Sequence, residues 1–247
     1  MRGETLFRIR MPLLYSTLVA GELAGAALHR AFPAASAPLV GVVTLPSIYL
    51  LLVPGTPEGW APAYLVPAGL AAAAYVLRAW ATAYLGFAVV GGRRLRTERL
   101  VVDGPYAFVR NPLYAGLVLL GAAVGVASPP PALALVVLGL GLLVAALARA
   151  EERRLAPAHP EWAEYARHVP RLVPRPTPWR AASASRARAR PYWVEGLVGE
   201  AWQLSVVVGF LALATPVRSG APIAVLLALL AWAAAVRSRR LPFPRPA

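Results

Sequence analysis

Polar side chains capable of chemistry stand on both sides of one apolar stretch of the chain. Asp103–Gly116 precedes most of this stretch and includes a Gly-Pro-Tyr run and an Arg-Asn-Pro run, while Glu151-Glu152 follows it. Asp-Gly-Pro predicts a turn, and Pro112 suits the first turn of a helix, whose free N–H groups favour anions. The arginine, amide and phenols suit a carboxylate, and the glutamates suit an ammonium, a sulfonium or a ribose diol. The pattern predicts a site for a zwitterionic ligand; the alternative is that these charges anchor helix ends as solvated ion pairs.

The elements that must position these residues are membrane helices. The chain has 247 residues, 58% hydrophobic and 15% charged, with a formal net charge of +14. Soluble domains carry about 25% charged residues, so this composition argues against a soluble enzyme and against a disordered basic tail. We expect an all-α, polytopic transmembrane helix bundle.

Seven segments are apolar enough to be membrane-spanning candidates, since about 20 apolar residues cross a bilayer core. Glu22 interrupts the first segment, and proline interrupts the second. The first segment also lacks the clean cleavage site of a signal peptide, so we expect the amino terminus to be retained. The segments are Met11–Leu28, Pro38–Val53, Ala61–Val90, Pro112–Ala127, Ala132–Ala148, Val194–Ala214 and Ala221–Val236.

The fourth and fifth segments are joined by a Ser-Pro-Pro-Pro turn and therefore predict an antiparallel hairpin. Both polar ends of a hairpin lie on the same side of the membrane. Residues 91–111 should therefore lie beside residues 149–192. If all seven segments cross, 19 of the 25 arginines fall on that side, which the positive-inside rule makes cytoplasmic. We expect a bacterial inner-membrane protein whose site faces the cytoplasm, although Arg2, Arg8 and Arg10 conflict with the orientation that this gives the amino terminus.

Missing residue types exclude several chemistries. The chain has no cysteine and no lysine, so thiolate catalysis, cysteine-ligated metals, Schiff bases and Walker-type phosphate binding have no candidate residue. The three histidines form no His-x-x-x-His pair, so we expect no metal site. The Gly139-Leu140-Gly141 run lies in an apolar segment and is typical of a helix contact.

The order and spacing of the polar residues resemble the isoprenylcysteine carboxyl methyltransferase family and related phospholipid methyltransferases. The resemblance covers about Arg78 to Pro174. It is carried by Gly104-Pro105-Tyr106, Arg110-Asn111-Pro112, Tyr114, Gly116, Glu151-Glu152, Tyr165, and Val169-Pro170-Arg171 with Pro174, after an upstream Arg78-Ala79-Trp80.

The resemblance implies an integral-membrane methyltransferase that uses S-adenosylmethionine on a lipophilic or membrane-embedded carboxylate, amine or thiol. The implied catalytic residues are Arg110, Asn111, Glu152, Arg153 and Arg171. The implied cofactor-binding residues are Gly104, Pro105, Tyr106, Asn111, Pro112, Tyr114, Gly116, Glu151 and Glu152. Asn111 stands where the family usually has histidine, and an amide does not titrate near neutral pH.

This interpretation divides the chain into amino-terminal membrane segments (1–60), a catalytic core with the hairpin (61–174), a basic linker (175–192), and a carboxy-terminal helix pair with its tail (193–247). The core would be a five-helix, methyltransferase-like bundle. We expect membrane lipids as partners, a lipophilic or lipid substrate and no nucleic acid. Glu22 and Arg78, both within predicted segments, are candidates for function or for a mutual ion pair. The alternative functions are a non-catalytic membrane scaffold and a transporter-like helix bundle.

Overall fold

A computed structural model describes residues 64–90, 100–127, 130–180 and 190–214. Within these ranges every regular element is a helix, which confirms the all-α prediction. Two helical segments, Leu65–Leu85 and Leu133–Ala158, are long and apolar enough to cross a membrane, and a bent pair forms a third if it is one span. The predicted number of seven is not confirmed; Met11–Leu28, Pro38–Val53 and Ala221–Val236 lie outside the described residues.

The third predicted segment forms helix α4 (Leu65–Leu85) and the short α5 (Phe87–Val90). Alanine dominates the buried face of α4, which favours helix formation and lets neighbouring helices approach closely. Gly86 ends α4 with a φ of 92°, in a region that side chains with a Cβ rarely adopt. The predicted continuous helix, Ala61–Val90, is therefore broken near its carboxy-terminal end.

The predicted hairpin consists of α6 (Pro112–Val126) and α7 (Pro130–Ala158). Helix α6 begins at Pro112, as the sequence predicts, because proline suits the first helical turn. Helix α7 continues ten residues beyond the predicted end at Ala148. The glutamate pair consequently lies on the last turns of a long helix rather than in a loop after it.

The remaining described elements are a 3₁₀ turn, η3 (Gly104–Ala107), before α6, the short helix α8 (Trp162–His168), and a bent carboxy-terminal segment. That segment was predicted as one helix, Val194–Ala214. The structure divides it into α9 (Trp193–Gly199), η4 (Ala201–Gln203) and α10 (Leu204–Ala214). The axis of the segment bends by 42° between its two halves.

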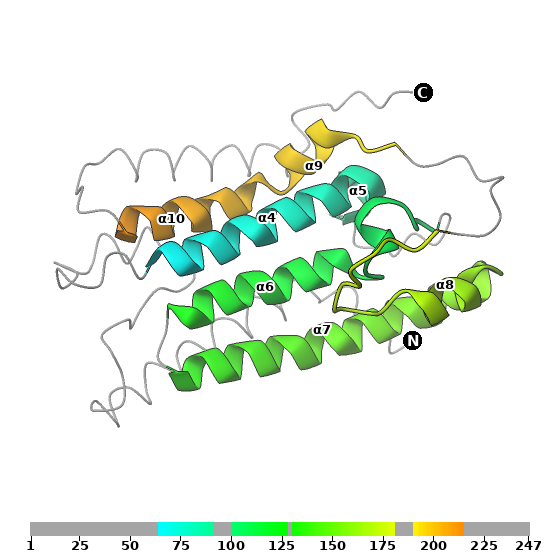
Figure 1. Cartoon of the computed structure of the whole chain (residues 1–247), viewed down its shortest axis with the longest axis horizontal. Helices are drawn as coiled ribbons and strands as arrows, with labels where there is room; N and C mark the ends of the chain where they lie inside the picture. Colours follow the sequence, from blue (N-terminus) through cyan, green and yellow to red (C-terminus); the bar gives the residue numbers. More distant parts are fainter. Residues whose placement is uncertain (1–63, 91–99, 128–129, 181–189, 215–247) are drawn as a thin grey trace.

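Helix α4 is the centre of the bundle: it packs on α6, α9 and α10, while α7 packs on the opposite side of α6. Figure 1 shows α10, α4, α6 and α7 as successive rods, with η3, α5 and α8 gathered at one end. The crossing of α4 and α9 is tight, since a Cβ on Gly196 would overlap the carbonyl oxygen of Ala79. The end that carries η3 and α8 is called the polar end below.

Candidate functional site

Glu152 is the centre of a cluster of charged side chains at the polar end. Its carboxylate accepts a bidentate pair of hydrogen bonds from Arg171: Nε lies 3.1 Å from Oε1 and Nη2 lies 2.7 Å from Oε2. Asn111 donates from Nδ2 to Oε1 at 2.9 Å, and Arg110 Nε lies 3.5 Å from the same oxygen. Glu152 is only 7% exposed. Arg110, Asn111, Glu152 and Arg171, four of the five predicted catalytic residues, therefore form one contact network, called the Glu152 cluster.

Backbone hydrogen bonds explain why the cluster forms. The amides of Arg110 and Asn111 donate to the carbonyls of Pro170 and Arg171, at 2.9 and 3.2 Å. Asn111 stands at the amino-terminal cap of α6, but its side chain makes no capping bond and reaches Glu152 on α7 instead. The loop before α6, the end of α7 and the segment after α8 are thus joined at one point, as the hairpin topology predicted.

The second glutamate makes a separate contact. Tyr114, on the first turn of α6, donates its hydroxyl to Glu151 Oε1 at 2.5 Å. Glu151 is partly exposed, whereas the Tyr114 ring is buried. Two neighbouring glutamates on α7 therefore make different contacts: Glu152 accepts from arginine and an amide, and Glu151 accepts from the Tyr114 phenol.

Two buried tyrosines support the loop before α6. Tyr165 of α8 donates its hydroxyl to the carbonyl of Tyr106 at 2.8 Å. Burial, the main cause, raises the pKa of both phenols, and the neighbouring glutamate Glu151 adds to the rise of the Tyr106 pKa. Both remain neutral at physiological pH. The Tyr106 hydroxyl is buried without a hydrogen-bond partner in the part of the chain that the structure describes.

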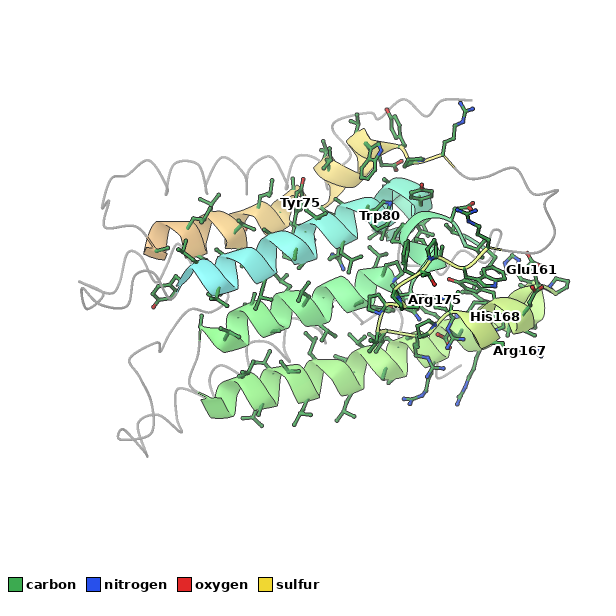
Figure 2. All side chains as sticks on the ribbon, in the orientation of Figure 1. Tyr75, Trp80, Glu161, Arg167, His168 and Arg175 are labelled. Atoms are coloured by element: carbon green, nitrogen blue, oxygen red, sulfur yellow. The ribbon has the colours of Figure 1, made fainter. Side chains whose placement is uncertain are left out.

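Aromatic rings lie beside Arg110 and along the segment after α8. The Arg110 guanidinium lies 5.8 Å from the centre of the Trp162 ring, a cation–π distance. The His168 and Trp179 rings stack at 6.1 Å, and Arg175 donates to the His168 carbonyl. Figure 2 shows His168 and Arg175 beside α8 at the polar end, far from Tyr75. These contacts hold Arg110 and the segment after α8 in place.

Other predicted site residues have local packing roles. Gly104 adopts a φ of 61° against the ring of Tyr84, and Gly116 lies against the Arg78 side chain, where a Cβ would meet Cγ at 2.5 Å. Pro105 is buried in η3, Pro112 opens α6, and Arg153 is exposed. The turn and the helix contact alone account for the types of the two glycines.

A second buried cluster, which the motif analysis missed, lies deeper in the bundle. Arg78 of α4 donates to Glu200 Oε2 at 2.9 Å, and Thr82 donates to Glu200 Oε1 at 2.9 Å. Gln203 completes it, with Nε2 at 2.8 Å from the same carboxylate. The signal was present, because Glu200 is an acidic residue inside an apolar segment, as Arg78 is a basic one. Glu22, the partner considered from the sequence, lies outside the described residues.

The chemistry available to the Glu152 cluster follows from its charges. Two guanidiniums face one carboxylate, and the hydrogen bond to Glu152 raises the pKa of Arg171. A third of the Arg171 side chain is exposed. Its guanidinium is therefore the part of the Glu152 cluster that an anionic group can reach from solvent. Residues 64–90, 100–127, 130–180 and 190–214 contain no group of three or more His, Asp or Glu side chains placed to hold a metal ion.

Sequence comparison gives two bacterial relatives. The chain is 39% identical over 114 residues to the cobalt-zinc-cadmium resistance protein CzcN of Cupriavidus metallidurans, across 44% of this chain and 48% of the relative. It is 32% identical over 132 residues to the nickel-cobalt-cadmium resistance protein NccN of Alcaligenes xylosoxydans xylosoxydans, across 51% of this chain and 57% of the relative. The chain thus spans about half the length of these curated relatives. No family model matches it. No solved structure matches it.

These comparisons correct the functional interpretation of the motif. Both relatives are named as metal-resistance proteins, so the assignment to the isoprenylcysteine carboxyl methyltransferase family and the methyltransferase activity are contradicted. A physical reason for the error is that the motif residues also satisfy packing needs. Gly104 makes a turn, Gly116 makes room for Arg78, and Asn111 and Glu152 join α6 to α7. The spacing of the motif residues therefore serves to hold the α6–α7 hairpin together.

Proposed function

We propose that the protein is an integral-membrane component of bacterial resistance to divalent transition-metal ions such as cobalt, zinc, cadmium or nickel. The similarity to two metal-resistance proteins carries this proposal. Helices long enough to cross a membrane support the location, and the arginine-rich polar end supports a cytoplasmic orientation in the inner membrane.

Within this function we propose a scaffold role rather than a path for the cation. Two buried carboxylates already accept hydrogen bonds on both of their oxygens. Glu152 accepts from Arg171 on each oxygen, and Glu200 accepts from Arg78 on one oxygen and from a hydroxyl on the other. A metal ion would have to displace these donors and approach a guanidinium, against strong repulsion at low dielectric. Such pairs fix helices in place, which suits a bundle that supports other components of the resistance apparatus.

Growth on metal tests the function. The full chain is produced in a metal-sensitive bacterial host, and the inhibitory concentrations of Co²⁺, Zn²⁺, Cd²⁺ and Ni²⁺ are compared with those of an empty-vector strain. We expect tolerance to rise for at least one of these ions when the partner components of a resistance system are present. Unchanged tolerance to all four, with the protein in the membrane fraction and the partner components present in both strains, contradicts the proposal.

Transport by the protein alone tests the scaffold role. Purified protein is reconstituted in liposomes that contain a metal-sensitive dye, and Zn²⁺ or Cd²⁺ is added outside. We expect no entry above that of protein-free liposomes. Entry that depends on the protein would replace the scaffold by the transporter-like alternative.

The binding of S-adenosylmethionine stays a prediction. It concerns binding alone, and no reaction is proposed for the ligand. We propose the Glu152 cluster together with the adjacent Glu151 as its site, because the exposed part of Arg171 suits a carboxylate and the partly exposed Glu151 suits an ammonium or a sulfonium. Calorimetric titration of the detergent-purified protein tests this, with S-adenosylhomocysteine as the comparison. Absence of saturable heat at millimolar ligand contradicts it, without affecting the metal-resistance proposal.

A further inference from the structure

The buried ion pair between α4 and the bend of the carboxy-terminal segment has a third partner on α6. Arg78 donates through Nε and Nη2 to Glu200 Oε2, both at 2.9 Å, and through Nη1 to the carbonyl of Leu113 at 2.8 Å. The Arg78 and Glu200 side chains are 7% and 1% exposed. One guanidinium thus connects three helical segments inside the bundle.

The bend of the segment coincides with Glu200. Helix α9 ends at Gly199, the chain turns through η4, and α10 starts at Leu204. Because helical bonding is interrupted here, the Glu200 side chain can face α4, where Arg78 and Thr82 donate to its two oxygens. Burying a charge is costly unless it is paired and fully bonded. The break and the ion pair therefore belong together.

The Leu113 carbonyl lies in the first turn of α6, two residues after Asn111. Asn111 is bonded to Glu152 on α7, so the start of α6 is held from one side by Arg78 and from the other by Glu152. Gly116, one turn along α6, has no side chain where the Arg78 stem passes. Four helical segments therefore meet around this one turn.

We infer that Arg78 and Glu200 form a membrane-buried clamp through which the α9–α10 segment positions the first turn of α6, and with it the Glu152 cluster. Arg78 is a positioning residue, because it acts on the cluster through the Leu113 carbonyl. The clamp gives the carboxy-terminal segment a role in ordering the polar end. The inference does not depend on metal resistance.

Hydrogen–deuterium exchange of the full chain in detergent tests the clamp. In the double variant Arg78→Met/Glu200→Leu, apolar side chains replace the pair, which avoids leaving an unpaired buried charge. We expect exchange in a peptide covering 112–118 to become about tenfold faster, the effect of losing one charge-assisted hydrogen bond. Exchange in a peptide of mid-α7, residues 138–146, should remain unchanged.

Tyr75→Phe is the matched control. Tyr75 lies on α4 one turn before Arg78 and donates to the Leu197 carbonyl of α9 at 3.1 Å. It contacts the same segment, but this bond does not involve α6. We expect faster exchange around Leu197 and no change in 112–118.

Three results overturn the inference: unchanged exchange in 112–118 of the double variant, equal acceleration there and in α7, or equal acceleration in the Tyr75→Phe control. If the double variant is absent from the membrane fraction, Arg78→Lys decides. A lysine keeps the charge beside Glu200 but lacks the fork that also reaches Leu113. We expect that variant to fold and to exchange faster in 112–118, and no acceleration overturns the inference.

Discussion

Glu152→Gln and Glu151→Gln are neighbouring substitutions for which the structure predicts very different effects. Glutamine keeps the shape of Glu152 but loses the charge that faces Arg171 at 2.7–3.1 Å and Arg110 at 3.5 Å. Losing a charge-assisted hydrogen bond costs about 1.5–3 kcal/mol, and the partial exposure of Arg171 lowers this toward about 2 kcal/mol. At Glu151, an amide oxygen can still accept from Tyr114, so we expect a cost of about 0.5 kcal/mol.

Reversible unfolding in mixed detergent micelles measures both effects as changes in the free energy of unfolding. We expect the Glu152 variant to be destabilised by at least about 1 kcal/mol more than the Glu151 variant. Circular dichroism of the folded baseline controls for a change of helical content. Equal losses, or a larger loss at Glu151, would refute the assignment of Glu152 as the centre of the polar end.

Two further predictions concern packing and pH. Gly116→Ala should lower the free energy of unfolding by about 1–3 kcal/mol, because the added Cβ meets the Arg78 side chain. Gly141→Ala has open space around the added Cβ and should raise the free energy of unfolding by up to about 1 kcal/mol. Two changes of the same sign in unfolding titrations would contradict this. Since burial raises the pKa of Tyr106 and Tyr165, their contribution to stability is complete below about pH 10 and is lost as pH rises further. The free energy of unfolding should fall by about 1.4 kcal/mol per pH unit for each phenol, and Tyr165→Phe should remove one such contribution. An unchanged slope between pH 10 and 11 in that variant would argue against a buried, neutral Tyr165.

The sequence predicted the helices where hydropathy and breakers agree. Helix α6 begins at Pro112 as expected, and the hairpin places Asn111 beside Glu152. Hydropathy failed at the polar end of α7, because the helix continues through Glu151 and Glu152 after the apolar run stops. Charged residues with good helix propensity extend a helix without leaving an apolar signal.

The sequence pattern also did not predict the bend at Glu200. The apolar run of 194–214 predicts one span, and the break depends on a carboxylate that is buried only because Arg78, far along the chain, lies opposite. The fact that Arg110, Asn111 and Arg171 share one glutamate likewise depends on backbone pairing between residues 110–111 and 170–171. A charged residue in an apolar segment signals a buried site, but the local sequence does not say which distant residue is its partner. The family assignment failed for a related reason, because a short motif specified a packing arrangement and was interpreted as a reaction.

Metal tolerance of Glu152→Gln and Glu151→Gln strains tests the central claim most directly. Both variants and the unmodified chain are produced at equal membrane levels in the metal-sensitive host with its partner components, and the inhibitory concentrations of Co²⁺, Zn²⁺, Cd²⁺ and Ni²⁺ are measured. We predict that the unmodified chain and the Glu151 variant raise tolerance and that the Glu152 variant does not. Tolerance equal to that of the empty vector in all strains, or equal protection by both variants, would contradict a metal-resistance function that depends on the Glu152 cluster.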